Sequence, residues 1–516
     1  MVGKESKMKN KFIRKWLVIL TVAAMMIPAG IPANAETVEE GENIAPTAGI
    51  SAETPNVTAE TQKEEISAEM PDMTAETQNE EKSDVQAEGQ NQEKQGVLEA
   101  VRQNTEKAEE ASDAVDVQAE ERTAGEVQIG EQIYPTLTEA FAAAKDGDVL
   151  RLLENAEVSQ PILLTKNVTL DTNGFTVSAA AGFKGNFMFT NRGTFNIVGS
   201  GKIDGSVGTY PLIMINNTGG AVLNIQSSEI TGQGVVQNVG GIVNITGGTL
   251  TASARNTVLS QFGEVHIGAS AHLMAAGEGK SAVQLIGAKM TLSGDAVLSG
   301  NGGIDVFNSN RNEEGTVSAQ VEITGGRIET KDFPVSGNNQ ESAGAEVAIT
   351  GGSLKNISGG TAIYWPMEGQ LTIGGNAVIE GGTGIEAKMG TITIKDNAVI
   401  TGSGEWKEEK PQNGGANPEG SAFLGSAQMY DGCINDSSLV VNILGGTLKS
   451  VNGNAVTIYN TEEKSDVRAD ISVTGGSLQP AAGKGAVKVI TSGDNTTRFD
   501  PDKKCRFVKH MLHPDQ

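Results

Sequence analysis

Cysteine and histidine are almost absent from this sequence of 516 residues, which contains two cysteines and four histidines. Cys433 and Cys505 allow at most one disulfide, which excludes a small fold held together by a disulfide network. The histidines show no spacing typical of a metal site, and His266 and His272 fall in one repeat, where we expect them on strands. We therefore expect no metal ion and no other cofactor.

Positive charge is also scarce, because 39 Lys and Arg residues face 64 Asp and Glu residues and the formal net charge is −25. Proteins that bind nucleic acid or anionic membranes need a basic surface. The composition argues against both kinds of partner.

Long apolar runs are missing except for WLVILTVAAMMIPAGI at residues 16–31, which follows a leader rich in lysine and arginine. This order, with ANA at 33–35, is typical of a secretory signal peptide cleaved between Ala35 and Glu36. A membrane anchor is the alternative, but Pro28 interrupts the run and the run is short for a span. We expect residues 1–35 to be removed and the mature chain to be secreted or displayed at the cell surface, without a membrane span.

Residues 36–125 are acidic, poor in aromatics and rich in Glu, Gln, Thr, Ala and Ser. They contain a tandem duplication, with ISAETPNVTAETQKEE at 50–65 followed directly by ISAEMPDMTAETQNEE at 66–81. Such a segment has too little apolar surface to offset the entropy lost on ordering. We predict a disordered acidic stalk that separates the leader from a folded domain.

The remaining chain repeats one pattern, seen as VNITGGTL at 243, VEITGGRI at 321, VAITGGSL at 347, VNILGGTL at 441 and ISVTGGSL at 471. We mark each repeat by the last apolar residue of its V-x-I segment. The twelve markers are Leu170, Ile197, Ile225, Ile245, Ile267, Leu292, Ile323, Ile349, Ile373, Ile394, Ile443 and Val473. Most of their separations lie in the twenties, and the interval between Ile394 and Ile443 is roughly twice as long. A period in the twenties with irregular loops indicates a solenoid.

Each unit contains three short strands. The first is the V-x-I segment, recognised by its period-two alternation, and a glycine corner separates it from the second. Two glycines supply positive φ at the first corner, a strand such as TLTA follows, and a third strand such as SAVQLIG at 281 completes the unit. Glycine and β-branched residues disfavour helical repeats, and a propeller blade needs a longer unit. The sequence therefore predicts an all-β, three-sheet parallel β-helix of about twelve coils over residues 126–495. The tail, 496–516, is expected to be irregular and to be the truncated end of a longer surface protein.

The entry to the array reads YPTLTEAFAAAKDGDVLRLLENAEV at 134–158. It predicts a helix from Thr136, the N-cap, to about Ala144, then a strand at DVLRLL, with the helix covering the open edge of the first coil. This stretch resembles the N-terminal cap of right-handed parallel β-helix proteins of the pectin-lyase-like superfamily. The resemblance implies that fold over 126–495. It leaves function open, because the superfamily includes polysaccharide lyases, hydrolases, esterases and adhesins.

The third strands place one outward residue of each coil in a column. The predicted column is Gln237, Ser260, Gln284, Asp305, Ser336, Tyr364, Glu386, Leu424, Thr457 and Lys488. Its two carboxylates, Asp305 and Glu386, are three coils apart, which is about 14 Å. Glycosidase carboxyl pairs lie about 5–9.5 Å apart, so this pair is unsuitable.

Tyr364, Glu386 and Lys388 are expected to cluster, and they are the only catalytic candidates. A lyase of the superfamily would need a basic or phenolic group together with acidic residues that hold calcium, and the acidic cluster is missing. The recognisable catalytic strings of polygalacturonases and pectate lyases are also missing, so no family residue transfers to this chain.

Aromatic residues make up 4% of the chain, so Tyr364, Trp365, Trp406 and Tyr430 are the candidates for stacking against a sugar. Packing is the alternative, above all for Trp365, because alternation points its side chain inward. Trp406 lies in the long interval between Ile394 and Ile443, where the insertion 402–420 interrupts the repeat.

Three functions fit these observations. The first is a monomeric, adhesin-like scaffold that binds glycans or host surface or matrix components. The second is a polysaccharide-active lyase or glycoside hydrolase. The third is a structural spacer from a larger surface protein.

Overall fold

A computed structural model describes residues 125–206, 210–307, 317–337, 345–408, 416–427, 438–460, 468–491, 496–501 and 506–507. All of them belong to one compact unit, Asp116–Gln516. The predicted leader and its cleavage site at Ala35 and Glu36, and nearly all of the predicted stalk, lie outside the described residues. Tyr430, Cys433 and Cys505 lie outside them as well.

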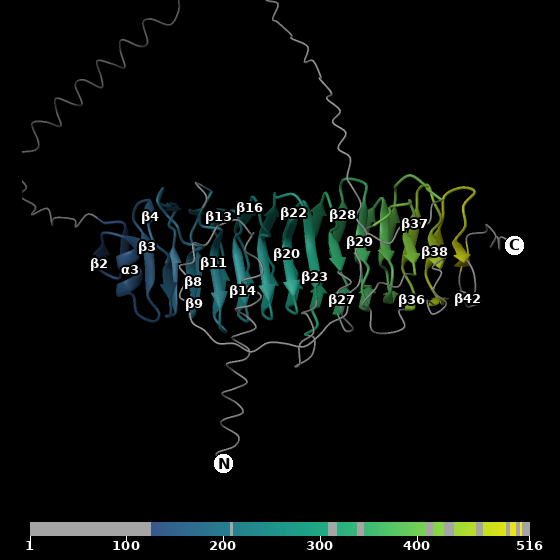
Figure 1. The fold of residues 1–516 in the computed structure, drawn as a ribbon, viewed down its shortest axis with the longest axis horizontal. Coiled ribbons are helices and arrows are strands. Elements are labelled where there is room, and N and C mark those ends of the chain that lie inside the picture. Colours follow the sequence, from purple (N-terminus) through teal and green to yellow (C-terminus); the bar gives the residue numbers. More distant parts are fainter. Residues whose placement is uncertain are drawn as a thin grey trace, which may run out of the picture. The chain divides into compact units, whose positions relative to one another are not determined.

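The described chain winds into three sheets that run along one elongated coil (Figure 1). Sheet A contains β2 Gln132–Tyr134, β1 Val127–Ile129, β3 Val149–Leu152, β6 Val168–Asp171, β9 Thr194–Val198, β12 Val222–Ile225, β15 Ile242–Ile245, β18 Glu264–Ile267, β21 Lys289–Leu292, β24 Gln320–Ile323, β27 Ala345–Ile349, β30 Gly369–Ile373, β33 Gly390–Ile394, β36 Ser438–Ile443, β39 Arg468–Val473 and β42 Thr496–Pro501.

Sheet B follows the first corner of each unit. It contains β4 Ala156–Val158, β7 Thr176–Ala179, β10 Lys202–Asp204, β13 Glu229–Gly232, β16 Thr249–Ala252, β19 His272–Ala275, β22 Val297–Gly300, β25 Arg327–Thr330, β28 Ser353–Asn356, β31 Val378–Gly381, β34 Val399–Gly402, β37 Thr447–Ser450, β40 Ser477–Gln479 and β43 Arg506–Phe507.

Sheet C completes the unit. It contains β5 Ile162–Leu164, β8 Phe187–Asn191, β11 Ile213–Thr218, β14 Val236–Val239, β17 Val258–Gln261, β20 Ser281–Ile286, β23 Gly302–Phe307, β26 Val335–Gly337, β29 Thr361–Trp365, β32 Thr383–Ala387, β35 Phe423–Ser426, β38 Val456–Asn460 and β41 Val487–Thr491. Apart from the antiparallel β1 and β2, each strand pairs in parallel with its equivalent one coil away, as in Ile245↔Ile267. The fold is therefore the right-handed parallel β-helix that the repeat predicts.

All twelve sequence markers form one column in sheet A, each in register with the next. All are buried, none more than 1% exposed. Even the longest interval keeps Ile394 opposite Ile443, because the extra chain leaves the coil between strands. The prediction that each coil buries the apolar face of its neighbour is confirmed.

The capping helix α3 spans Leu137–Ala143, and the Thr136 side chain accepts a hydrogen bond from Glu139 N at 3.2 Å, as an N-cap should. Its buried face includes Leu137, Ala140 and Phe141. The Phe141 ring lies 5.9 Å from that of Phe189 and 6.0 Å from that of Phe195. The helix therefore covers the first coils, as predicted.

Two sequence predictions need correction. The predicted irregular tail begins with β42, which pairs with β39, and β43 pairs with β40, so the coil extends beyond residue 495. In the predicted outward column, Leu259 and not Ser260 is in register with Gln237 and Gln284. Ser260 points inward, where Asn238 Nδ2 donates a hydrogen bond to its hydroxyl at 3.0 Å. Inward serine is favourable here because a buried amide supplies its partner.

Candidate functional site

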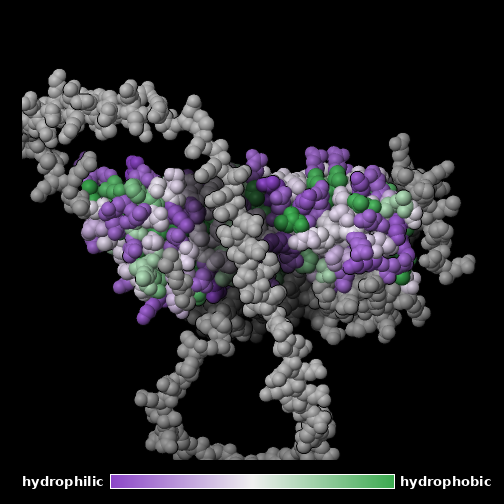
Figure 2. Space-filling model, turned by 90° about the horizontal axis from the view of Figure 1, so that it is seen from above, coloured by the Kyte–Doolittle hydropathy of each residue, from purple (hydrophilic) through white to green (hydrophobic). Residues whose placement is uncertain are grey.

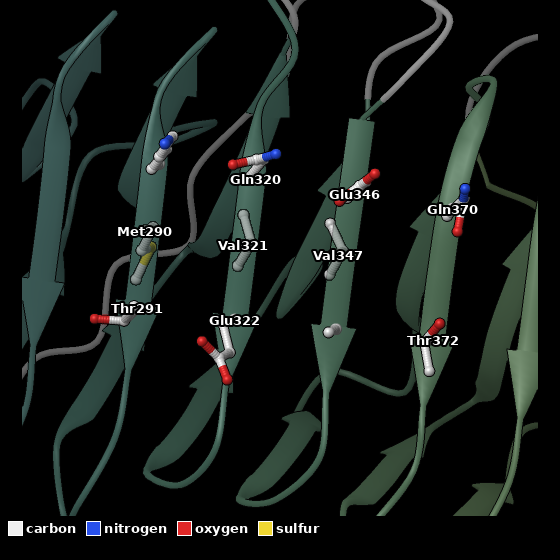
Figure 3. A pocket seen from close by; sticks show the side chains of 11 residues that line it. Met290, Thr291, Gln320, Val321, Glu322, Glu346, Val347, Gln370 and Thr372 are labelled. Atoms are coloured by element: carbon white, nitrogen blue, oxygen red, sulfur yellow. The ribbon is translucent and has the colours of Figure 1, made fainter.

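A groove of about 440 Å³ runs across the outer face of sheet A, over strands β21, β24, β27 and β30. Its volume is within the range of about 300–1,000 Å³ found for ligand pockets. Figure 3 shows its side chains on neighbouring parallel strands, so that equivalent positions of successive coils lie side by side. The groove crosses the coils, and a chain-like ligand would meet one strand after another.

Two rows of residues line the groove. The first row is Lys289, Gln320, Glu346 and Gln370, and the second is Thr291, Glu322, Ala348 and Thr372, each residue in register with the next. Alternation along each strand turns these side chains outward, while those between them, such as Val321, point into the core. The single methyl group of Ala348, between Glu322 and Thr372, leaves a hollow in the second row.

The groove presents amide, hydroxyl and carboxylate groups to solvent. Gln320, Gln370, Glu322 and Glu346 are exposed, and each can donate or accept hydrogen bonds. Lys289, at one end of the first row, is the one cation among the lining residues. Sequence reasoning missed this groove. The only trace of the groove in the sequence is the set of outward residues in the V-x-I segments. None of these residues was an aromatic or a catalytic candidate.

The predicted trio Tyr364, Glu386 and Lys388 does come together on sheet C. Tyr364 is in register with Glu386, and Lys388 Nζ lies 4.0 Å from Glu386 Oε1 and 5.2 Å from the centroid of the Tyr364 ring. On its other side, Tyr364 stacks on Phe333 with ring centroids 5.1 Å apart. All three members of the trio are buried, with Glu386 and Lys388 at 0% exposure.

The trio is enclosed because the end of the insertion, residues 416–421, folds over sheet C. We call this segment the cover. Asn417 N donates to Glu386 Oε2 at 2.7 Å, and Glu419 N donates to Thr383 Oγ1 at 2.9 Å. Ser450 Oγ donates to Gly420 O at 2.6 Å. The outward face of sheet C is therefore closed at this point, where the sequence predicted an exposed column.

The cover adds a second buried carboxyl, Glu419, which the sequence did not single out because the insertion has no repeat to align. Burial raises the pKa of Glu419 to about 8. The hydroxyls of Ser421 and Thr457 oppose this shift, and the negative charge of Glu386 adds to it. Burial also raises the pKa of Glu386 to about 7, while Lys388 and the Asn417 amide lower it.

Of the other aromatic candidates, the structure describes Trp365 and Trp406. Trp365 is fully buried in the core, as the packing alternative predicted, and has no face for a ligand. Trp406 is half-buried in the insertion, with Lys484 Nζ 4.5 Å from its ring centroid. A single aromatic ring already covered by lysine offers little area for sugar stacking.

Asp305 and Glu386 are separated by Ser336 and Tyr364 in the register, which is three strand spacings, as predicted. Asp305 accepts hydrogen bonds from Ser281 Oγ at 2.7 Å and Ser336 Oγ at 2.5 Å, and burial raises its pKa. These contacts give Asp305 a local structural role.

His266 and His272 lie on strands β18 and β19. His266 Nδ1 is 2.9 Å from Thr291 Oγ1, and His272 Nε2 is 2.9 Å from Ser299 Oγ. Within the described ranges, no three His, Cys, Asp or Glu side chains form a cluster able to hold a metal ion.

In the same part of the chain, no helix is both long and apolar enough to cross a membrane. No protein-family model matches this chain, and neither a curated protein nor a solved structure matches it.

Proposed function

We propose that this protein is a secreted or cell-surface binding scaffold of the pectin-lyase-like type, and that its sheet A groove holds a neutral glycan chain. The groove carries the proposal, because it is a concave surface that presents several polar side chains at a regular spacing. Amides, hydroxyls and carboxylates are the groups that hydrogen-bond to sugar hydroxyls. A rigid row of such groups requires little ordering when a ligand binds.

The spacing along the coil supports a polymer as the ligand. Strands in a sheet are about 4.8 Å apart, so the four strands under the groove span about 14 Å. Successive sugar rings of an extended glycan advance by a similar step, and each ring would meet a new coil. Weak contacts repeated along the coil add up through multivalency.

The charges support a neutral ligand. Glu322 and Glu346 lie in the groove with one cation, Lys289, and the chain as a whole is strongly acidic. Sulfated or uronic polymers would be repelled by this surface. The face in Figure 2 is dominated by hydrophilic and neutral residues, with apolar residues in small separate spots. The groove on sheet A exposes amides, hydroxyls and carboxylates, which favours a glycan over a protein partner, whose interface would need an apolar core.

The burial of Tyr364, Glu386 and Lys388 supports binding over catalysis. A polysaccharide has no open path to these side chains while the cover is in place. A purely structural spacer would leave the groove without a ligand, and the experiment below distinguishes these alternatives.

The test is a glycan-array and affinity measurement with the full chain and a Gln320→Ala/Gln370→Ala variant. The two amides lie in one row of the groove, and losing two hydrogen bonds of about 0.5–1.5 kcal/mol each weakens binding by roughly 5- to 150-fold. Binding should also be insensitive to salt, because a neutral sugar carries no charge to screen.

The matched control is Gln479→Ala, which removes an exposed glutamine from sheet B and should leave affinity unchanged. Equal affinity of the double variant and the control would move the contact away from the groove. Binding to no neutral glycan on the array would reject the proposal.

A further inference from the structure

The cover is attached to the coil by a small number of polar contacts around buried ionisable groups. Two of its backbone amides, Asn417 N and Glu419 N, donate to the side chains of Glu386 and Thr383, which both belong to strand β32. Glu419 itself is 3% exposed, and Glu386 is fully buried beneath it. We therefore expect the cover to stay docked only while the charges of the buried groups at this point, Glu386, Glu419 and Lys388, nearly balance.

The charges at the centre do not balance when both carboxyls are ionised. Among the described residues, Glu386 lies beside one cation, Lys388, whose ammonium also lies against the Tyr364 ring, and the charge of Glu419 interacts with that of Glu386. The centre holds one negative charge too many unless a carboxyl takes up a proton.

Glu419 is the carboxyl with few stabilising partners. Within the described residues, neither of its oxygens accepts a hydrogen bond with regular geometry. The nearby hydroxyls of Ser421 and Thr457 lie 2.7 Å apart and share one hydrogen bond, so at most one hydroxyl proton is left for the two oxygens of Glu419. A buried carboxylate with so few donors is less stable than the neutral acid.

We propose that residues 416–421 form a pH-controlled cover, which a protonated Glu419 keeps docked on sheet C and which ionisation of Glu419 releases. Release exposes the outward face of β29 and β32, including Tyr364 and Glu386, to solvent. The cover lies on sheet C and the groove lies on sheet A. This proposal and the glycan-binding proposal can therefore be tested independently of each other.

The direction of the pH effect follows from the two raised pKa values. A carboxyl whose pKa is higher in the docked state than in the released state binds its proton more tightly when docked. Its stabilisation is complete below the ordinary glutamic acid pKa of 4.5 and is lost as the pH rises through about 7 for Glu386 and about 8 for Glu419. The cover is therefore docked in acid and released in alkali.

Hydrogen exchange of the full chain, corrected for the intrinsic pH dependence of amide exchange, tests this directly. From pH 6 to pH 9, protection of residues 416–421 should fall at least tenfold, while strands β15 and β18 should keep theirs. In Glu419→Gln, which is uncharged and similar in shape, protection should fall much less over the same range, because only Glu386 still titrates. Glu405→Gln, an exposed carboxyl of the same insertion, is the control and should behave like the wild type.

Wild-type protection that does not change between pH 6 and pH 9 would overturn the proposal, even if Glu419→Gln failed to fold. An equal loss of protection in wild type and Glu419→Gln would also overturn it, because the titrating group would then be another one.

Discussion

The two glycines of each corner are required for different physical reasons. The second glycine adopts a left-handed backbone in all five quoted repeats, with φ between 78° and 86° at Gly248, Gly326, Gly352, Gly446 and Gly476. The first lies too close to the preceding coil for a side chain, since a Cβ at Gly351 would be 2.3 Å from Thr324 O. The sequence predicted positive φ at both glycines, which is confirmed for the second and wrong for the first. Only the stacked coils reveal the close approach that requires the first glycine.

A buried ladder of amides on the inner side of sheet C is a second feature at residue scale. Asn191 Nδ2 donates to Asn217 Oδ1 at 2.8 Å, and Asn217 Nδ2 donates to Asn238 Oδ1 at 2.9 Å. Asn217 Nδ2 also donates to the backbone oxygens of Ala221 and Ile242. Each amide thus satisfies polar groups of its own coil and of the next.

Asn217→Ala should destabilise the protein by roughly 1–3 kcal/mol, because it leaves the buried Asn238 Oδ1 without its donor, while a backbone oxygen such as Ala221 O keeps the bond from Ile242 N. Asn224→Ala is the matched control. Asn224 belongs to a half-exposed ladder on sheet A and donates to Asn196 Oδ1 at 2.7 Å, but water can replace it. Urea unfolding should show that Asn224→Ala lowers the free energy of unfolding by about 1 kcal/mol or less. Equal losses would show that burial of the ladder is unimportant.

The error at Ser260 shows how far residue-scale prediction reaches. In the strand VLSQ, either Leu259 or Ser260 could be assigned to the outward face, and a shift of one residue exchanges the two faces of a strand. Alternation alone did not separate Leu259 from Ser260. The decisive contact, with Asn238, comes from the neighbouring coil.

At the scale of elements, the capping helix was predictable and the insertion was not. The helix carries local signals, namely Thr136 as N-cap and an apolar face that meets a flat sheet edge. The insertion lacks a period and a binary pattern, so the docking of Glu419 over Glu386 could not be predicted. The trio of Tyr364, Glu386 and Lys388 was predictable because strand register alone brings those residues together.

Phe141→Ala should destabilise the N-terminal coils by about 3–5 kcal/mol, the usual effect of removing a buried phenylalanine. Its ring packs on those of Phe189 and Phe195, and without it the edge of the first coil is open to pairing with other chains. Hydrogen exchange should show lower protection in β8 and β9, and light scattering should show faster aggregation on heating.

The control for this change is Leu163→Ala, which shortens a side chain 56% exposed on the neighbouring strand β5. It should leave both measurements unchanged. If Phe141→Ala had no greater effect than Leu163→Ala, the helix would not be needed to protect the edge.

At the scale of the whole molecule, the coil is a stack in which each unit contacts its neighbours, and stability is close to a sum of nearest-neighbour terms. The apolar periodicity predicted this arrangement over almost its full length, because every coil repeats the same burial. The groove on sheet A was not predicted, since it depends on which outward side chains happen to be short, as at Ala348.

Removing one whole coil, Thr246 to Ile267, should give a folded protein, because Ile245 and Ile267 occupy equivalent positions. Circular dichroism should retain the β-sheet signal and melting should remain cooperative, at a moderately lower temperature. Removing only the first half of that coil, Thr246 to Asn256, joins sheet A directly to sheet C and should give an aggregating, poorly folded chain. Similar behaviour of the two deletions would contradict the register.

The marker residues point into the core. The middle residue of each V-x-I segment points outward and does not contribute to the core. Val321 and Ile323 stay inside whatever residue replaces Glu322 between them. Natural variation can therefore change the chemistry of the outer surface one position at a time, while the folding of the coil stays the same. A lineage that carries this coil can acquire a new surface without passing through unstable intermediates.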